Sequence, residues 1–273
     1  MNVEDIKDII YEKEDNGICT ATLNIPKRRN AMSFVTFLEL VTILDDMEAD
    51  KNAKVLILTG CEEANAFSSG GYFNMNILTK VPQEIMKDID LQDIAQKKLC
   101  LRLWNFSKPV IAAVNGLAVG AGFTMLLAGA DLIYMSEDAW VGFYFVKRAV
   151  MAEFAAHFLL PFYVGFQKAK EIVYFGKKLT AKEAVELGLA NKVLPREDLL
   201  SFAREQALKL IPPKGPSLSI KLMKKTMHDY YKDILEETLD LENEGLRTLL
   251  KSSDFRASLK SLVTKKEPRF KGK

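Results

Sequence analysis

The sequence predicts an α/β fold in which short buried strands alternate with helices. Continuous apolar runs occupy segments 53–60, 109–116 and 130–136, and such runs are typical of strands buried on both faces. Segments with a helical spacing of apolar residues alternate with them, most clearly at 33–50. Apolar residues make up 48% of the 273-residue chain, so we expect one large domain or a domain with an appendage. This alternation favours an α/β layout or a spiral of β-β-α units.

The first 50 residues predict a hairpin followed by a helix. Two extended runs within residues 7–25 flank a turn at Asn16-Gly17, and Pro26 ends the second run. The helix is expected over 33–50, with Ser33 as the candidate N-cap. Its predicted buried stripe consists of Phe34, Phe37, Leu38, Val41, Leu44 and Met47.

Two further segments carry helical signals. Residues 74–104 are polar with a helical pattern, and we interpret them as a helical insertion or flap. Thr180 and Glu183 form a capping box that begins another helix, and Gly188 is its expected stop.

A Pro- and Gly-rich segment at 211–217 is the clearest linker in the chain, and only helices are expected after it. We therefore divide the chain into a core of residues 1–205 and a C-terminal helical region of residues 206–273.

Composition excludes several classes of protein. The formal charge of +2 indicates neither a nucleic-acid nor a membrane partner, and lysines near the C-terminus are interleaved with acids. No apolar run approaches the roughly 20 residues of a membrane span. Cys19, Cys61 and Cys100 form no CxxC pair, so we expect no disulfide framework or metal site and a reducing compartment, the cytoplasm.

Two turns rich in small residues point to chemistry at the ends of strands. Gly120-Ala121-Gly122 follows an apolar run and opens an apolar helix, and segment 66–73 places Gly70-Gly71 after another run. The first N–H groups of a helix lack internal partners and carry partial positive charge. Small side chains would let a substrate oxygen reach them, which favours an oxyanion hole. Tight helix–sheet packing is the alternative interpretation.

Seven motifs follow one another along nearly the whole chain: RRNAMS, VLILTG, AFSSGG, KPVIAAVNGLAVGAG, ADLIY, FGKKLTAKEAVELGLANKV and PRFKG. In their content and order they resemble the crotonase (enoyl-CoA hydratase/isomerase) superfamily. The resemblance implies a spiral of β-β-α units with a C-terminal helical trimerisation region, hence a homotrimer or a dimer of trimers. It also implies an acyl-CoA substrate and no cofactor beyond the coenzyme A of that substrate. Gly71 and Ala121 would supply the two N–H donors to the thioester oxygen.

The same resemblance implies a coenzyme A path along the loops. Its candidate contacts are Arg28, Arg29, Ala31, Ser69, Phe73, Phe270 and Lys271. Arg28, Arg29 and the adjacent Lys27 have cations suited to phosphate oxygens. A solvated charged loop at 27–29 and a frayed basic end at 270–271 are the alternatives.

The sequence departs from the family where hydratases carry two glutamates. The first position falls on Thr124 or Met125, and the second on Phe145 or Tyr144, depending on how the spacing is counted. Neither alternative is acidic, which argues against ordinary hydration. Tyr72 also replaces the family's usual Asp.

One acid remains in the relevant segment. Some Δ3,Δ2-enoyl-CoA isomerases carry a single glutamate about eight residues before a proline, and Glu153 stands in that relation to Pro161. One carboxylate in an apolar pocket can remove a proton and return it elsewhere. The alternative is a surface helix acid. His157 lies one turn further on and is expected to bond to Glu153, to carry protons or to be structural. His228 is expected to be solvated.

We therefore predict an acyl-CoA enzyme that stabilises a thioester enolate, most specifically a Δ3,Δ2-enoyl-CoA isomerase. A hydratase-like enzyme or an acyl-thioester decarboxylase using Lys80 or Lys147 is the first alternative, and SSGG resembles polyketide-pathway decarboxylases. A non-catalytic CoA-binding scaffold is the second.

Overall fold

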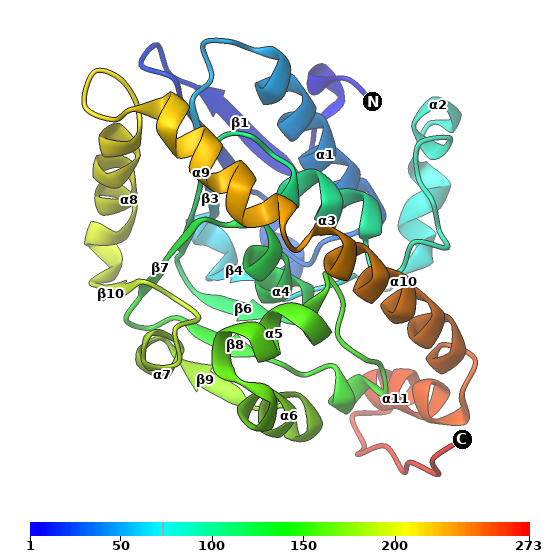
Figure 1. Cartoon of the computed structure of the whole chain (residues 1–273). Coiled ribbons are helices and arrows are strands. Elements are labelled where there is room, and N and C mark those ends of the chain that lie inside the picture. The colour runs from blue at the N-terminus through cyan, green and yellow to red at the C-terminus, as the bar shows by residue number, and fades with distance from the viewer. Residues whose placement is uncertain (73) are drawn as a thin grey trace.

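Two β-sheets form the centre of the protein, and helices surround them (Figure 1). The computed structural model describes residues 1–72 and 74–273, the side chains of residues 75, 77 and 80 excepted. The six-stranded sheet has the order β1-β2-β3-β5-β7-β10: Ile9–Lys13, Ile18–Leu23, Val55–Gly60, Val110–Val114, Leu132–Ser136 and Lys192–Leu194. The four-stranded sheet has the order β4-β6-β8-β9: Ala66–Ser68, Leu117–Val119, Trp140–Gly142 and Lys178–Thr180.

From β3 to β8, successive strands alternate between the two sheets. β3, β5 and β7 lie side by side and parallel in the large sheet, and β4, β6 and β8, which follow each of them, lie parallel in the small one. Helices α3 (Lys97–Trp104), α4 (Ala121–Gly129) and α5 (Ala156–Val164) complete the three units. This repetition confirms the expected crotonase-like spiral of β-β-α units.

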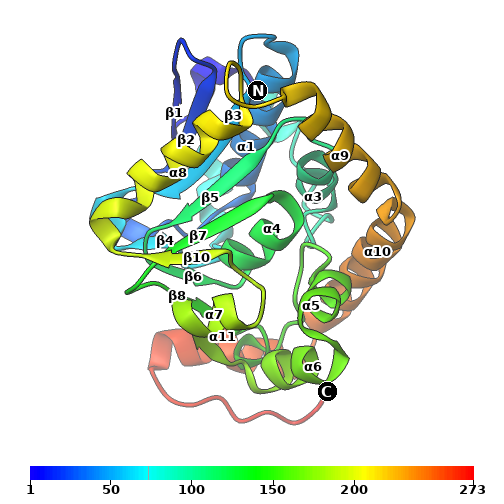
Figure 2. The same cartoon turned by 60° about the vertical axis from the view of Figure 1, so that its left-hand side comes forward.

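The core lies on both faces of the large sheet. All six residues of β3 are buried, as its continuous apolar run predicts. On one face α8 (Arg196–Leu210) packs across β3, β5 and β7, and on the other α1 (Phe34–Ala49), α3 and α4 pack together (Figure 2).

The N-terminal predictions are confirmed. β1 and β2 pair as an antiparallel hairpin around Gly17, whose φ is +94°. The Ser33 hydroxyl accepts a hydrogen bond from the N–H of Thr36 (3.4 Å) at the start of α1. The α1 stripe faces the core, with Met47 and Leu44 almost fully buried.

Residues 74–104 are less helical than the sequence predicts. A 3₁₀ segment (Met75–Lys80) and one turn, α2 (Gln83–Met86), precede an irregular stretch, and only α3 is a full helix. Short polar side chains cause this, because they bond to the backbone in place of a helix ladder. The Asp90 carboxylate accepts from the N–H of Gln92, and Asp93 accepts from the first N–H groups of α3.

The C-terminal helical region returns to cover the core. It contains α9 (Ser217–Asp229), α10 (Lys232–Leu249) and α11 (Ser253–Thr264), and α10 packs against α3 and α5. The predicted boundary at residue 205 falls inside α8. The last helix that packs on the large sheet, α8, is followed by the connection of residues 211–216. The other helices are α6 (Phe166–Phe175), α7 (Ala181–Glu186), which begins at the predicted capping box, and short 3₁₀ turns at Val3–Asp5, Pro26–Arg28, Glu62–Ala64 and Val146–Arg148.

Candidate active site

A cavity of about 760 Å³ lies where the loops after β4 and β6 face the segment before α5. Small residues of the two loops, Ser69, Gly70, Gly71, Gly120 and Ala121, line one part of it, and side chains from α10 and α11 form its far wall. Gly71, Ala121 and Glu153, predicted as separate parts of one site, all line it.

Parallel pairing of β4 with β6 brings the two small-residue loops together. Ser68 is paired with Ala118, so the residues that follow both strands emerge at the same sheet edge. The N–H groups of Gly71 and of Ala121, the first residue of α4, donate to no acceptor among the described residues. Both donors are therefore free for a ligand in the cavity.

The small side chains also serve close packing. A Cβ on Gly122 would lie 2.7 Å from the carbonyl oxygen of Ser68, so α4 contacts β4 through bare backbone. Gly70 and Gly120 have φ values of +97° and +54°, which favour glycine. The packing interpretation and the donor interpretation are thus both consistent with this turn.

Glu153 lies just before α5, in a backbone segment of unusual conformation. Phe154 and Ala155, which follow it, have φ values of +61° and +55°, rare for residues with a Cβ. The Glu153 side chain is partly exposed to the cavity, and the described residues offer its carboxylate no hydrogen bond. Burial raises its pKa to about 8, and the negative charges of Glu242 and Asp93 add to the increase.

Glu153 is the one carboxylate among the described residues that line the cavity. Tyr144 and Phe145, at the second hydratase position, also line it, and Thr124 and Met125, at the first, are buried. The second carboxylate that the resemblance implies for hydratases is thus not found among the described residues of this lining.

Cationic groups also reach the cavity. Lys147 lies 3.8 Å above the ring centroid of Tyr144, and Arg148 is next to it. The side chain of Lys80, the other lysine considered for a decarboxylase, lies outside the described part of the structure.

The predicted coenzyme A contacts are dispersed. Ser69 lines the cavity and its hydroxyl donates to the carbonyl of Arg28 (3.1 Å). The Arg28 guanidinium is held by Asp8 (2.7 Å) and lies 4.7 Å from the ring centroid of Tyr72. Arg29 is exposed and donates to the carbonyl of Asn65 (3.4 Å).

The other predicted contacts are either not among the residues that line the cavity or fall outside the described residues. Ala31 is buried, and Phe73 falls outside the described residues. Phe270 is 48% exposed in the stretch after α11, where the N–H of Lys271 donates to Asp254 (2.7 Å).

The two histidines have structural contacts. The Nδ1 of His157 lies 2.7 Å from Glu242 Oε1. His157 therefore bonds to Glu242 and not, as one of the expectations had it, to Glu153. The expectation that His228 is solvated is wrong. Its ring stacks on Trp104 at 4.1 Å, its Nδ1 lies 2.6 Å from the carbonyl of Trp104, and burial lowers its pKa.

Sequence reasoning missed the apolar far wall of the cavity. It is lined by Leu246 of α10, Leu250 just after α10, Leu259, Leu262 and Val263 of α11, and Met151. Their helical spacing could have indicated apolar faces, but no local pattern says which surface those faces cover.

Comparison with known proteins decides the family. Residues 13–273 match the family model described as Enoyl-CoA hydratase/isomerase. The chain belongs to this family. A putative enoyl-CoA hydratase of Thermus thermophilus is 30% identical over 96% of this chain and 100% of its own length. The 1,2-epoxyphenylacetyl-CoA isomerase of Escherichia coli is 29% identical over 97% of this chain and 99% of its own length.

Solved structures support the fold. The crystal structure of an enoyl-CoA hydratase/isomerase from Pseudoalteromonas atlantica superposes with a TM-score of 0.84, at 23% identity, over 97% of this chain and 100% of that one. This hydratase/isomerase family member is thus an acyl-CoA enzyme with the crotonase fold. None of the helices in the described part of the chain combines the length and apolar character needed to cross a membrane.

Proposed function

We propose that this protein is a Δ3,Δ2-enoyl-CoA isomerase in which Glu153 is the base. The observation that carries the proposal is a single described carboxylate in a cavity that also presents two unpartnered N–H groups. Ordinary hydration in this family uses two carboxylates, and the described lining offers one.

The proposed reaction moves one double bond and conserves all atoms. The N–H groups of Gly71 and Ala121 donate to the thioester oxygen. Glu153 removes a proton from C2, and the electrons of the broken C–H bond move into the thioester to give a dienolate. The same carboxyl group then protonates C4, so that the bond between C3 and C4 becomes single and a double bond forms between C2 and C3. Preorganised donors stabilise the negative charge that develops on oxygen.

The apolar far wall supports a hydrophobic acyl group. Leu246 of α10 and Leu259 and Leu262 of α11 line the cavity together with Glu153, and Lys147 and Arg148 line it too. In this proposal the acyl chain lies against the leucines. The coenzyme A part lies towards Ser69 and the loops that carry Arg28, Arg29, Ala31 and Phe73, with Phe270 and Lys271 as further contacts, and no other cofactor takes part. The three buried free cysteines support a reducing compartment such as the cytoplasm.

Turnover of a 3-enoyl-CoA, followed by absorbance of the conjugated 2-enoyl thioester, tests the proposal. Glu153→Gln should lower kcat by about 10²–10⁴-fold with little change in KM, because the amide cannot accept the C2 proton. Glu244→Gln is the matched control, since Glu244 is an exposed carboxylate.

Three outcomes would contradict the proposal. Full activity of Glu153→Gln would show that Glu153 is not the base. Formation of a 3-hydroxyacyl-CoA from a 2-enoyl-CoA, or release of CO₂ from a malonyl-type thioester, at a higher rate than isomerisation would favour the first alternative. Acyl-CoA binding without turnover by the wild type would favour a scaffold.

A further inference from the structure

One buried carboxylate has no part in the proposed proton transfers. Glu242 lies on α10 and is 1% exposed. Its Oε2 accepts a hydrogen bond from the N–H of Ala155 (2.8 Å). Its Oε1 accepts from the N–H of His157 (3.1 Å) and lies 2.7 Å from His157 Nδ1.

These contacts hold the backbone that immediately follows Glu153. Ala155 and His157 stand at the start of α5, where N–H groups have no partner within the helix. Phe154 and Ala155 are both left-handed, and such residues persist only where the surroundings hold them. The buried carboxylate of Glu242 accepts from two of these N–H groups at once.

We propose that Glu242 is a positioning residue: by accepting the N–H groups of Ala155 and His157 it fixes the turn that directs Glu153 into the cavity. The inference rests on the proposed role of Glu153 as base. It makes the C-terminal helical region part of the active site, because the carboxylate comes from α10 and the segment it holds precedes α5.

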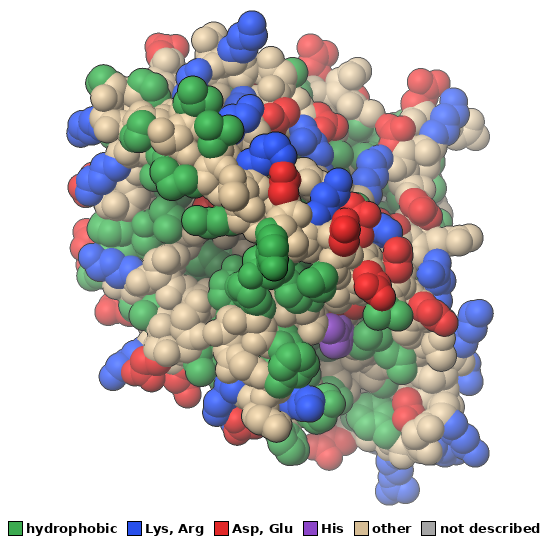
Figure 3. Space-filling view, in the orientation of Figure 1, with side chains coloured by type: hydrophobic (Ala, Val, Ile, Leu, Met, Phe, Trp, Pro, Cys, Tyr) green, Lys and Arg blue, Asp and Glu red, His purple; other side chains and the backbone are tan. Residues whose placement is uncertain are grey.

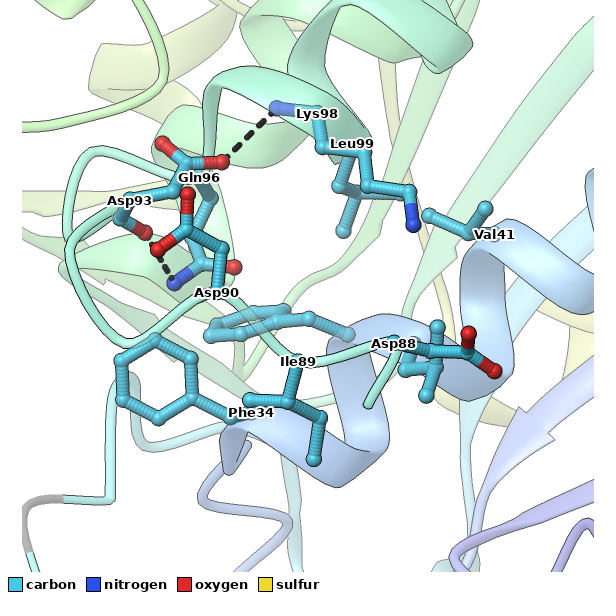
Figure 4. Close-up of a pocket in the computed structure, with 11 residues that line it drawn as sticks. Phe34, Val41, Asp88, Ile89, Asp90, Asp93, Gln96, Lys98 and Leu99 are labelled. Atoms are coloured by element: carbon cyan, nitrogen blue, oxygen red, sulfur yellow. Dashed lines mark hydrogen bonds between the residues drawn. The ribbon is translucent and has the colours of Figure 1, made fainter. Parts of the chain in front are cut away.

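The next residue of α10 makes a parallel set of contacts. Asn243 is buried, its Oδ1 accepts from the N–H of Ala95 (2.8 Å), and its Nδ2 donates to Asp93 Oδ1 (3.0 Å). Figure 4 shows Asp93 beside Gln96 and Lys98 at the start of α3. The N–H of Phe154 donates to the carbonyl of Ala95 (3.3 Å), so both held segments contact each other. The position of α10 therefore sets both the backbone that follows Glu153 and the segment before α3 that contacts it.

Charged groups near Glu153 come from several elements. Glu242 of α10 and Asp93 of the segment before α3 both raise the pKa of Glu153. His157 of α5 is bound to Glu242, the Cys100 thiol of α3 is buried with its pKa raised, and Lys147 and Arg148 line the same cavity. Removing the charge of Glu242 should therefore lower the pKa of Glu153. Shortening the Glu242 side chain while keeping its charge should misplace Glu153 without lowering that pKa.

Two variants of Glu242 separate charge from geometry. Glu242→Gln keeps the length and loses the charge. We expect kcat to fall by about 10–100-fold with KM within about twofold, and the acid limb of the kcat/KM profile to move to lower pH. Glu242→Asp keeps the charge and is one methylene shorter. We expect a similar loss of kcat with the acid limb unmoved.

Glu244→Gln is again the control, because it removes a charge from an exposed position on the same helix. Circular dichroism and thermal unfolding establish that each variant is folded, and Glu242→Asp tests the geometry even if the Gln variant is unstable. Folded Glu242 variants with wild-type kcat and an unmoved acid limb would overturn the inference. If Glu153→Gln is inactive in the same series, the proposed function survives that result; if Glu153→Gln is fully active, the proposed function itself fails.

Discussion

Glu153 must lose its proton to act as a base, yet it lies where water solvates its charge poorly. Burial, and after it the nearby charges of Glu242 and Asp93, raise its pKa to about 8, above the ordinary value of 4.5. A base with a pKa near the working pH combines sufficient ionisation with sufficient proton affinity. The environment of this one side chain therefore supports the role proposed for it.

The pH dependence of catalysis follows from that pKa. We expect kcat/KM to increase about tenfold per pH unit below pH 8 and to level off above it, because only the ionised carboxylate removes a proton. Initial rates with a 3-enoyl-CoA between pH 6 and 9.5 measure this. A level profile across that range would contradict the assignment of Glu153.

Stability should respond to pH in the opposite direction. The folded-state pKa lies above the unfolded one, so the folded protein binds the extra proton between pH 4.5 and 8. The contribution of Glu153 to the free energy of unfolding is therefore fully present below the unfolded pKa and decreases as pH rises to about 8. Glu153→Gln serves as the control, because this contribution is absent from its urea denaturation curves.

At the scale of the element, the start of α4 combines two requirements. Its first N–H is the proposed donor at Ala121, and its second residue, Gly122, packs directly on β4. The distance between helix and strand thus sets both the packing and the place of the donor.

A methyl group at this contact should disturb both properties. In Gly122→Ala the new Cβ would lie 2.7 Å from the Ser68 carbonyl oxygen, so α4 must move away from β4. We expect a loss of about 1–3 kcal/mol in unfolding free energy and at least about a tenfold loss of kcat. Urea denaturation and steady-state kinetics measure the two effects.

Gly129→Ala, at the other end of α4, is the control for stability without catalysis. Its Cβ would meet the side chain of Leu103, 2.8 Å away at the nearest atom, far along the helix from Ala121. Wild-type kcat in Gly122→Ala would show that the start of α4 does not position a catalytic donor.

At the scale of the whole molecule, one face carries many exposed apolar side chains. Figure 3 shows hydrophobic side chains gathered on the face that carries α9 and α5. They include Leu218, Leu222, Met223, Met227 and Tyr230 of α9 and its end, and Phe162 and Phe166 on α5 and α6. Monomeric proteins rarely expose apolar patches of large size, and the resemblance to crotonases implies a trimer or a dimer of trimers.

We therefore expect self-association in solution. Sedimentation equilibrium should give at least three times the chain mass of 30.7 kDa, and Met227→Glu combined with Leu222→Glu should lower that mass. Leu200→Glu, an exposed leucine on α8, is the matched control and should leave it unchanged. A wild type that sediments as a single chain at micromolar concentration would contradict the expectation.

The sequence by itself determined the features that depend on neighbours in the chain. The Asn16-Gly17 hairpin, the Ser33 cap, the Thr180–Glu183 capping box and the buried run of β3 follow from local backbone chemistry and from side-chain periodicity. The resemblance carried by the motifs predicted the spiral fold. It also identified Gly71, Ala121 and Glu153 as candidate site residues, and all three line one cavity.

The tertiary structure alone decided the features that depend on how helices dock. The contact of Glu242 with the start of α5, the stacking of His228 on Trp104 and the apolar wall from α10 and α11 join residues far apart in sequence. The 74–104 segment also departs from its helical pattern: the Asp90 carboxylate accepts from the N–H of Gln92 in place of a helix bond, and Asp93 accepts from the first N–H groups of α3, which begins only at Lys97. No local spacing encodes which surfaces meet, since that depends on the packing of the whole chain.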